Sequence, residues 1–469
     1  MNLARHSPIL LVTTMTFLLA GCVTHRAKTA QIGELVEDDT FTENGTVEAP
    51  ELWWSAFGHD ELSELVSRSL EGNLDIRQAW ERLSQAQASY LRTRSGKLPS
   101  VNLTNERTYV DDLSNDDPTT KSSSMGLSLS YQVDLWGQIA ADTRADSLTY
   151  QATRKDLEAT ALTLTGQVGL AWLDLIDQSQ RLAVLTEQVS VNRDYLELVE
   201  LRFAQGLASA TEVYQQSQQL ADIENRIPQT RANIEIAEHQ LALLLGENPL
   251  SWSYSGDTQL PDMPALPQTG IPADVLAKRP DVKNAELRLF SADERLRSAK
   301  LDRYPRLDLT GSVASGDRDL TPSLDAWVLN LAGNLIQPLF DGGARKAEVA
   351  RNRAAVEELF YAWKKTVYVA IAEVEDALVQ EHALLESLAG TRKRVTLAER
   401  TLDSAHKNYV NGVVDYLTVL TSLQTLQNLQ LEEVQAQRAA LANRIELYLS
   451  LGGHWTEDLE KPFAVAQGK

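Results

Sequence analysis

Cysteine is almost absent from this sequence, aromatic residues are sparse, and basic residues are fewer than acidic ones. The 469 residues include one cysteine, which excludes disulfides, thiolate zinc clusters and thiol chemistry in the folded body. Lysine and arginine number 44 against 65 acidic residues, so the formal net charge is −21. A charge of this sign repels phosphate backbones, and nucleic acid is therefore not an expected partner.

Long apolar runs are also lacking beyond the N-terminus, so the sequence excludes a helical membrane protein. The N-terminus itself has Arg5, an apolar stretch from Ile9 to Leu19, and then Ala20-Gly21-Cys22. This pattern predicts a signal peptide over residues 1–21 and a lipobox, in which Cys22 becomes the acylated first residue of the mature chain. The alternative is a simple signal peptide followed by an unrelated cysteine.

The chain contains an internal sequence repeat, and the second copy follows the first at an offset of 206 residues. The landmark pairs at this offset are Asp75 and Asp281, Pro99 and Pro305, Gly137 and Gly343, Gly206 and Gly412, and Gly246 and Gly452. Prolines between the copies predict an extended linker. The expected organisation is a signal peptide (1–21), a lipidated extended segment (22–58), a first repeat (59–246), a Pro-rich linker (247–271), a second repeat (272–452) and a C-terminal tail (453–469).

Each repeat contains a long heptad pattern that predicts a coiled-coil helix. In the first copy, positions stepping alternately by three and four residues are apolar except for two polar ones; they are 161, 164, 168, 171, 175, 178, 182, 185, 189, 192, 196, 199 and 203. Uninterrupted helices over 138–203 and 344–409 would each be roughly 100 Å long. Gly206 and Gly412 would end them, and Ser209 and Asp415 would cap antiparallel return helices. Shorter helices over about 60–95 and 273–300 open the copies.

Between the opening and long helices the hydrophobic period changes to two, which predicts strands. In the first copy Leu127, Leu129, Tyr131 and Val133 alternate with polar or small residues. A partner strand is expected over about 101–110, and in the second copy strands are expected over about 307–313 and 326–336. Each chain therefore contributes two β-hairpins.

Strands that are apolar on one face and polar on the other are typical of transmembrane barrels, in which closure removes every exposed edge. Four strands cannot close a barrel, so several chains would have to contribute hairpins. The alternative is a soluble sheet that packs against another domain. The lipobox and the matching position of the hairpins in both repeats favour the barrel.

Several motifs resemble those of the TolC-like outer-membrane efflux channels. They are Trp53-Trp54, Asn73-Leu74-Asp75, Arg279-Pro280-Asp281-Val282, Phe340-Asp341-Gly342-Gly343, and the two segments that end in Gly206 and Gly412. The lipobox points to the lipoprotein branch of that family. The resemblance implies a mainly α-helical fold with a membrane β-barrel: a homotrimer with a 12-stranded barrel in the outer membrane of a Gram-negative bacterium and an α-helical tunnel in the periplasm.

The same resemblance implies a function, that of the exit duct of a tripartite pump for drugs or other small toxic compounds. Its partners would be outer-membrane lipid, a periplasmic adaptor protein and an inner-membrane efflux transporter that supplies the energy. Gly206, Leu207, Gly412 and Val413 would be the adaptor-docking tips. Asp415 would be either a gate residue or only a helix cap, and Leu127, Leu129, Tyr131 and Val133 would face lipid.

Chemical sites find no support in the sequence. It has no phosphate-binding Gly-x-x-x-x-Gly-Lys loop, and its seven histidines are never paired at the three- or four-residue spacing that suits a metal. We therefore expect no enzyme activity, no cofactor and no metal. The rival to a channel is a lipid-anchored periplasmic coiled-coil scaffold without a pore, but it leaves both hairpins unexplained.

Overall fold

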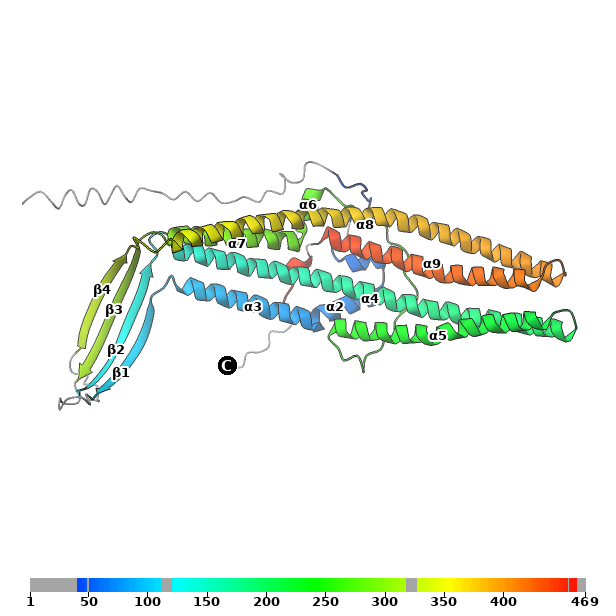
Figure 1. Cartoon of the computed structure of the whole chain (residues 1–469), viewed down its shortest axis with the longest axis horizontal. Helices are drawn as coiled ribbons and strands as arrows, with labels where there is room; N and C mark the ends of the chain where they lie inside the picture. The colour runs from blue at the N-terminus through cyan, green and yellow to red at the C-terminus, as the bar shows by residue number, and fades with distance from the viewer. Residues whose placement is uncertain (1–39, 49, 112–119, 318–326, 454, 462–469) are drawn as a thin grey trace, which may run out of the picture. The chain divides into compact units, whose positions relative to one another are not determined.

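The computed structural model describes residues 40–48, 50–111, 120–317, 327–453 and 455–461, and they form a mainly helical protein with one small β-sheet (Figure 1). The chain divides into two units. The described part of the sheet unit is drawn from 89–148 and 288–360, and that of the helical unit from 40–88, 149–287 and 361–461. Cys22 and the signal peptide lie outside the described residues.

The sheet unit contains four antiparallel strands in sequence order, as Figure 1 shows. They are β1 (Ser100–Val110), β2 (Thr120–Val133), β3 (Arg306–Asp317) and β4 (Trp327–Ile336). The predicted strands are confirmed, but β2 and β3 extend further toward the connecting turns than the apolar alternation indicated. Strands β1 and β4 are the two edges. The hairpins of both repeats thus form one sheet through the β2–β3 pairing.

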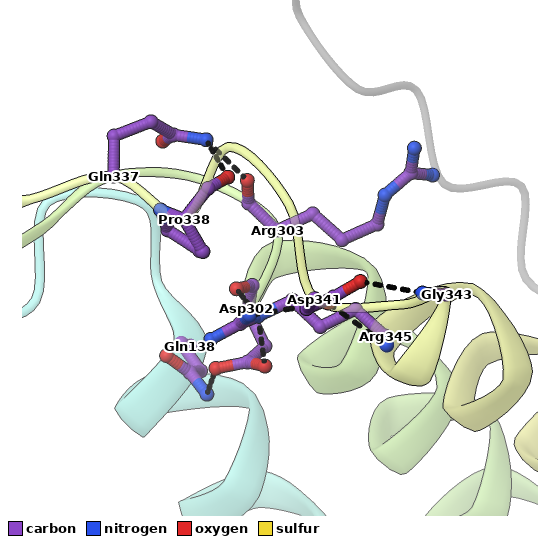
Figure 2. Close-up of polar contacts among 8 residues, drawn as sticks. All are labelled: Gln138, Asp302, Arg303, Gln337, Pro338, Asp341, Gly343 and Arg345. Carbon is purple, nitrogen blue, oxygen red and sulfur yellow. Dashed lines mark hydrogen bonds and ion pairs between the residues drawn. The ribbon is translucent and has the colours of Figure 1, made fainter.

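Short turns with aspartate caps lead from the sheet into the long helices. Asp134 accepts hydrogen bonds from the backbone amides of Ile139 (3.1 Å) and Ala140 (2.8 Å), and so caps the start of α4 (Gln138–Ala204). In the second copy Asp341 accepts from the amide of Gly343 (2.9 Å) before α8 (Ala344–Val410) (Figure 2). Gly343 has a φ of 90°, which explains why glycine occupies this turn.

The long helices and their return helices are confirmed. Helices α4 and α8 have 67 residues each, and α5 (Ala210–Leu245) and α9 (Tyr416–Leu451) have 36 each. The predicted seam is largely buried, because its apolar residues pack between helices. Phe203 is the exception: it lies at the tip and is 49% exposed, so its seam assignment is wrong. Helix α4 also holds an 18-residue window with mean hydropathy of 1.2, but 61% of it is buried inside the protein.

The opening helices are each broken, which corrects the prediction of continuous helices. Asn73 separates α2 (Asp60–Gly72) from α3 (Leu74–Ser95), and its Oδ1 caps α3 by accepting from the amide of Asp75 (2.8 Å). In the second copy Arg279 separates α6 (Pro272–Lys278) from α7 (Pro280–Leu301). Arg279 precedes a proline and is therefore pushed to extended backbone angles, which ends the helix.

An extended belt crosses the helical unit. The belt is made of the linker (247–271) and of residues 40–48 of the N-terminal segment. The linker carbonyls of Pro264 and Ala265 accept hydrogen bonds from Nη1 of Arg444 (2.6 and 2.7 Å). Arg444 is 1% exposed and forms an ion pair with Glu381, which is 3% exposed. Position 381 is the counterpart of seam position 175 in the second repeat, and this pairing explains why an acidic residue is buried there. Arg444 of α9 thus joins the linker to both α8 and α9.

Within the belt, the N-terminal segment is hydrogen-bonded to the linker. The amide of Gly45 donates to the carbonyl of Pro267 (3.1 Å), and the amide of Gln268 donates to the carbonyl of Val47 (2.7 Å). Phe41 is buried, and the amide of Thr42 donates to Glu375 (2.9 Å). Glu375 of α8 thus binds the N-terminal segment.

Candidate functional site

The pairing of the strands sorts their side chains into two chemically distinct faces. On one face a row of paired residues contains Leu103, Leu127, Val313 and Leu329, and the next row contains Val101, Leu129, Gly311 and Leu331. Tyr131 and Val133 continue this face, since they are two and four residues beyond Leu129. The four residues expected to face lipid therefore share one apolar face.

The opposite face is polar and uncharged along its centre. One row contains Asn102, Ser128, Ser312 and Asn330, and the next contains Ser100, Ser130, Thr310 and Ala332. The serine, threonine and asparagine side chains of these rows can form hydrogen bonds with water, whereas the leucine side chains of the other face cannot. A sheet of this kind suits an apolar environment on one side and an aqueous one on the other.

Much of the apolar face is open in the single chain. Leu127 is 51% exposed, Leu129 40% and Leu331 78%. The two edge strands β1 and β4 are exposed along their whole length, and no further strand in the described residues pairs with them. Both the face and the edges therefore need a partner that the isolated chain does not supply.

The tips of the two helical hairpins have the same backbone geometry. The amide of Leu207 donates to the carbonyl of Arg202 (2.8 Å), and the amide of Val413 donates to the carbonyl of Asn408 (2.8 Å). Gly206 and Gly412 both have a φ of 72°. This arrangement is a Schellman motif, which requires a left-handed residue and therefore favours glycine. It leaves Leu207 61% and Val413 70% exposed, as a docking surface would require.

Both predicted caps of the return helices are confirmed. Ser209 and Glu212 form a capping box at the start of α5. Asp415 caps α9, because its Oδ1 accepts from the amide of Thr418 (3.1 Å) and from the hydroxyl of the same residue (2.8 Å). The carboxylate of Asp415 is thus already used by the helix, while its side chain remains exposed.

Two tyrosines join the hairpins at these tips, a connection that the sequence analysis did not predict. Tyr409 of α8 donates to Oε2 of Glu212 (2.9 Å), and Tyr416 of α9 donates to Oε1 of Gln216 (2.7 Å). The guanidinium of Arg202 lies 4.5 Å from the centre of the Tyr409 ring. Burial and the hydrogen bond to Glu212 raise the pKa of Tyr409 to about 12, so its hydroxyl stays a donor at neutral pH.

A buried amide network continues this connection along the hairpins. Gln216 donates to Oδ1 of Asn192 (3.0 Å), and Gln219 donates to Oε1 of Gln427 (3.1 Å). Gln216 and Asn192 are both completely buried. Asn192 was identified as a polar interruption of the seam, and the network explains why it is tolerated there. Within the described residues, no group of three or more metal-binding side chains comes together.

The chain is similar to known proteins over most of its length. The sequence model of the outer membrane efflux protein family matches residues 65–247 and 271–453, two stretches that begin at the offset of the internal repeat. The chain is 32% identical over 418 residues to the pyoverdine export outer membrane protein OpmQ of Pseudomonas aeruginosa, covering 87% of this chain and 88% of that protein.

Two further relatives cover nearly all of the chain. It is 26% identical to the probable outer membrane lipoprotein SilC of Salmonella typhimurium, over 96% of this chain and 99% of that protein. Among solved structures, the outer-membrane channel OprN superposes with a TM-score of 0.81 at 23% identity, over 92% of this chain and 100% of that chain. The fold is therefore that of an outer-membrane channel.

Proposed function

Because the chain belongs to the outer membrane efflux protein family and acts as an outer-membrane efflux channel, we propose that three copies close one pore for export. The observation that carries this proposal is the two-faced sheet with two unpaired edges. Pairing β4 of one copy with β1 of the next removes every edge. Three copies of four strands give a 12-stranded barrel, with the apolar face toward lipid and the polar face toward the lumen.

The test of this proposal uses the wild-type protein. Light scattering in detergent should give the mass of three chains, and insertion into planar bilayers should give stepwise ion conductance. A monomer or dimer without conductance would contradict the pore and favour the scaffold without a pore.

The central rows of the polar face bear on the cargo. Their serine, threonine and asparagine side chains hold no ionic group that could retain a charged solute, and charged residues such as Asp308 lie toward the ends of the face. We propose that the duct passes small molecules with little discrimination. The relative OpmQ is named for the export of pyoverdine. Drugs or other small toxic compounds remain the expected cargo class, and the energy comes from an inner-membrane transporter.

Docking to a periplasmic adaptor is proposed for the tips, from the exposed Leu207 and Val413. Leu207→Asp or Val413→Asp should reduce efflux in cells and cross-linking to the adaptor, without loss of the trimer. Leu397→Asp is the matched control, because Leu397 is 51% exposed on α8 away from the tips. Equal efflux in all three variants would remove the tips from docking.

Anchoring through an acylated Cys22 is proposed from the lipobox, and the relative SilC is also named a lipoprotein. The lipid on Cys22 would then attach the chain to the outer membrane in addition to the barrel.

A further inference from the structure

Two consecutive large apolar residues, Leu339 and Phe340, are almost completely open to solvent. They lie in the loop between β4 and α8 and are 93% and 92% exposed. Single exposed apolar side chains are common on protein surfaces, but two adjacent ones at this exposure form a patch. Leu335 and Ile336, at the end of β4, are also exposed, at 55% and 50%, on opposite faces of the strand.

The loop that carries this pair is held by hydrogen bonds on both sides (Figure 2). Before the pair, Nε2 of Gln337 donates to the carbonyl of Arg303 (3.2 Å). After it, Asp341 accepts from the amides of Gly343 and Arg345, and Nε of Arg345 donates to the carbonyl of Asp302 (2.9 Å). The backbone on either side of Leu339 and Phe340 is thus fixed. A loop whose backbone is already fixed loses little backbone conformational entropy on binding.

The topology of the sheet identifies what can reach the pair. The pairings Ser100 with Ser130, Val133 with Leu307, and Arg306 with Ile336 place the start of β1 and the end of β4 at the same end of the sheet. When β4 of one copy pairs antiparallel with β1 of the next, the residues just before that β1 arrive beside the residues just after β4. Those residues include Leu98, which is 69% exposed.

We propose that Leu339 and Phe340 form an intersubunit contact, in which they pack against Leu98 of the next copy at the helical end of the strand seam. This inference rests on the proposed trimeric barrel. It assigns to the loop a role that antiparallel pairing alone does not have: the apolar contact fixes the register in which the edge strands meet. A register shift of the seam would expose the pair again, and the contact therefore selects the register.

Cysteine cross-linking tests the contact directly in outer-membrane preparations of the full chain. The double variant Leu98→Cys/Phe340→Cys, treated with a short bismaleimide, should give covalent trimers on denaturing gels. Each single variant should give monomers. The control pair is Tyr109→Cys/Phe340→Cys, because Tyr109 is 58% exposed but lies near the far end of β1. Cross-linking of the control pair at the same yield would overturn the proposal.

A second variant measures the energetic contribution of the contact. Phe340→Ser should raise the rate at which the trimer dissociates in detergent roughly tenfold. Leu250→Ser is the matched control, since Leu250 is 91% exposed in the linker and should leave the rate unchanged. An unchanged rate for Phe340→Ser would overturn the proposal. So would labelling of residues 339–340 by a photoactivatable phospholipid, which would assign the pair to lipid.

The proposed contact can be absent even if the proposed trimeric pore exists. If the wild-type chain is not a trimer, the proposed pore and this contact both fail. If the wild type is a conducting trimer but the Leu98→Cys/Phe340→Cys variant gives no cross-link, only the contact fails.

Discussion

The hydroxyl group of Tyr409 lies 2.9 Å from Oε2 of Glu212, so one hydrogen bond joins the end of α8 to the start of α5. The two residues are 197 positions apart and belong to different repeats. This hydrogen bond lies at the tips of the helical hairpins. A duct that stayed open at rest would leak, and the tips are where it would have to close. Opening of the tips by separation of the hairpins would break the hydrogen bond.

We first predict that Tyr409→Phe raises the resting conductance of the channel. The variant removes the donor but keeps the ring beneath Arg202, and the loss of one hydrogen bond should cost about 1 kcal/mol. Single-channel recording in planar bilayers measures the effect. Tyr214→Phe is the control, because Tyr214 is 74% exposed on α5. A lower thermal stability with unchanged conductance would mean that the bond is structural only.

The second prediction concerns Asp415, whose role as a cap is visible and whose role as a gate is untested. Asp415→Ala removes the acceptor for Thr418 and should cost about 1 kcal/mol of stability. Asp415→Asn retains the cap without the charge. If a ring of carboxylates gates the channel, both variants should change the block by divalent cations. If only Asp415→Ala has an effect, and only on stability, the residue is a cap.

The third prediction separates the faces of the sheet. Leu129→Arg should destabilise the assembled channel by roughly 2 to 4 kcal/mol if residue 129 lies near the bilayer midplane, because it places a charge in lipid. Ser130→Arg, one position along the same strand, should change conductance and leave assembly intact. The fraction of heat-resistant trimer and the conductance are the two readouts. Equal loss of assembly in both variants would contradict the alternation.

The fourth prediction concerns the N-terminus. Cys22→Ser should abolish labelling with radioactive palmitate and prevent processing before residue 22. Because the barrel would also hold the protein in the membrane, efflux should fall only in part. Unchanged labelling would show that the lipid is attached elsewhere or that the lipobox assignment is wrong.

The fifth prediction concerns the ion pair between Arg444 and Glu381. Glu381→Leu leaves the charge of Arg444 buried without its carboxylate and should destabilise the protein by about 3 to 5 kcal/mol. The second substitution Arg444→Met, added to the first, should restore part of this loss because it removes the uncompensated charge. Denaturant unfolding measures both variants, with the exposed Glu187→Gln as control. No recovery in the double variant would assign the stability to the contacts of Arg444 with the linker carbonyls.

Periodicity predicted the long helices and the strands because both patterns are repeated over many residues. The boundaries of α4 and α8 were within one residue of the expected ends. Turn chemistry was also readable, since a Schellman motif requires glycine and a capping box requires serine and glutamate at fixed spacing. The breaks at Asn73 and Arg279 were missed, although the proline after Arg279 was a signal for one of them.

Contacts between distant segments could not be predicted in the same way. Tyr409 reads in the sequence as one more seam residue, and Glu212 as half of a capping box. Only the juxtaposition of the two hairpins makes them hydrogen-bond partners. The same holds for Glu381, which the heptad pattern marks as a polar interruption while its partner Arg444 lies 63 residues away.

The attachment of the N-terminal segment to the linker sets the length of a tether. Phe41 is the first buried residue of the described chain, and it lies nineteen positions after Cys22. A polypeptide of that length reaches about 65 Å at full extension. A lipid on Cys22 would therefore confine the belt of the helical unit within that distance of the leaflet that holds the acyl chains. Variants in which this segment is shortened by known numbers of residues would measure the distance between the belt and the membrane.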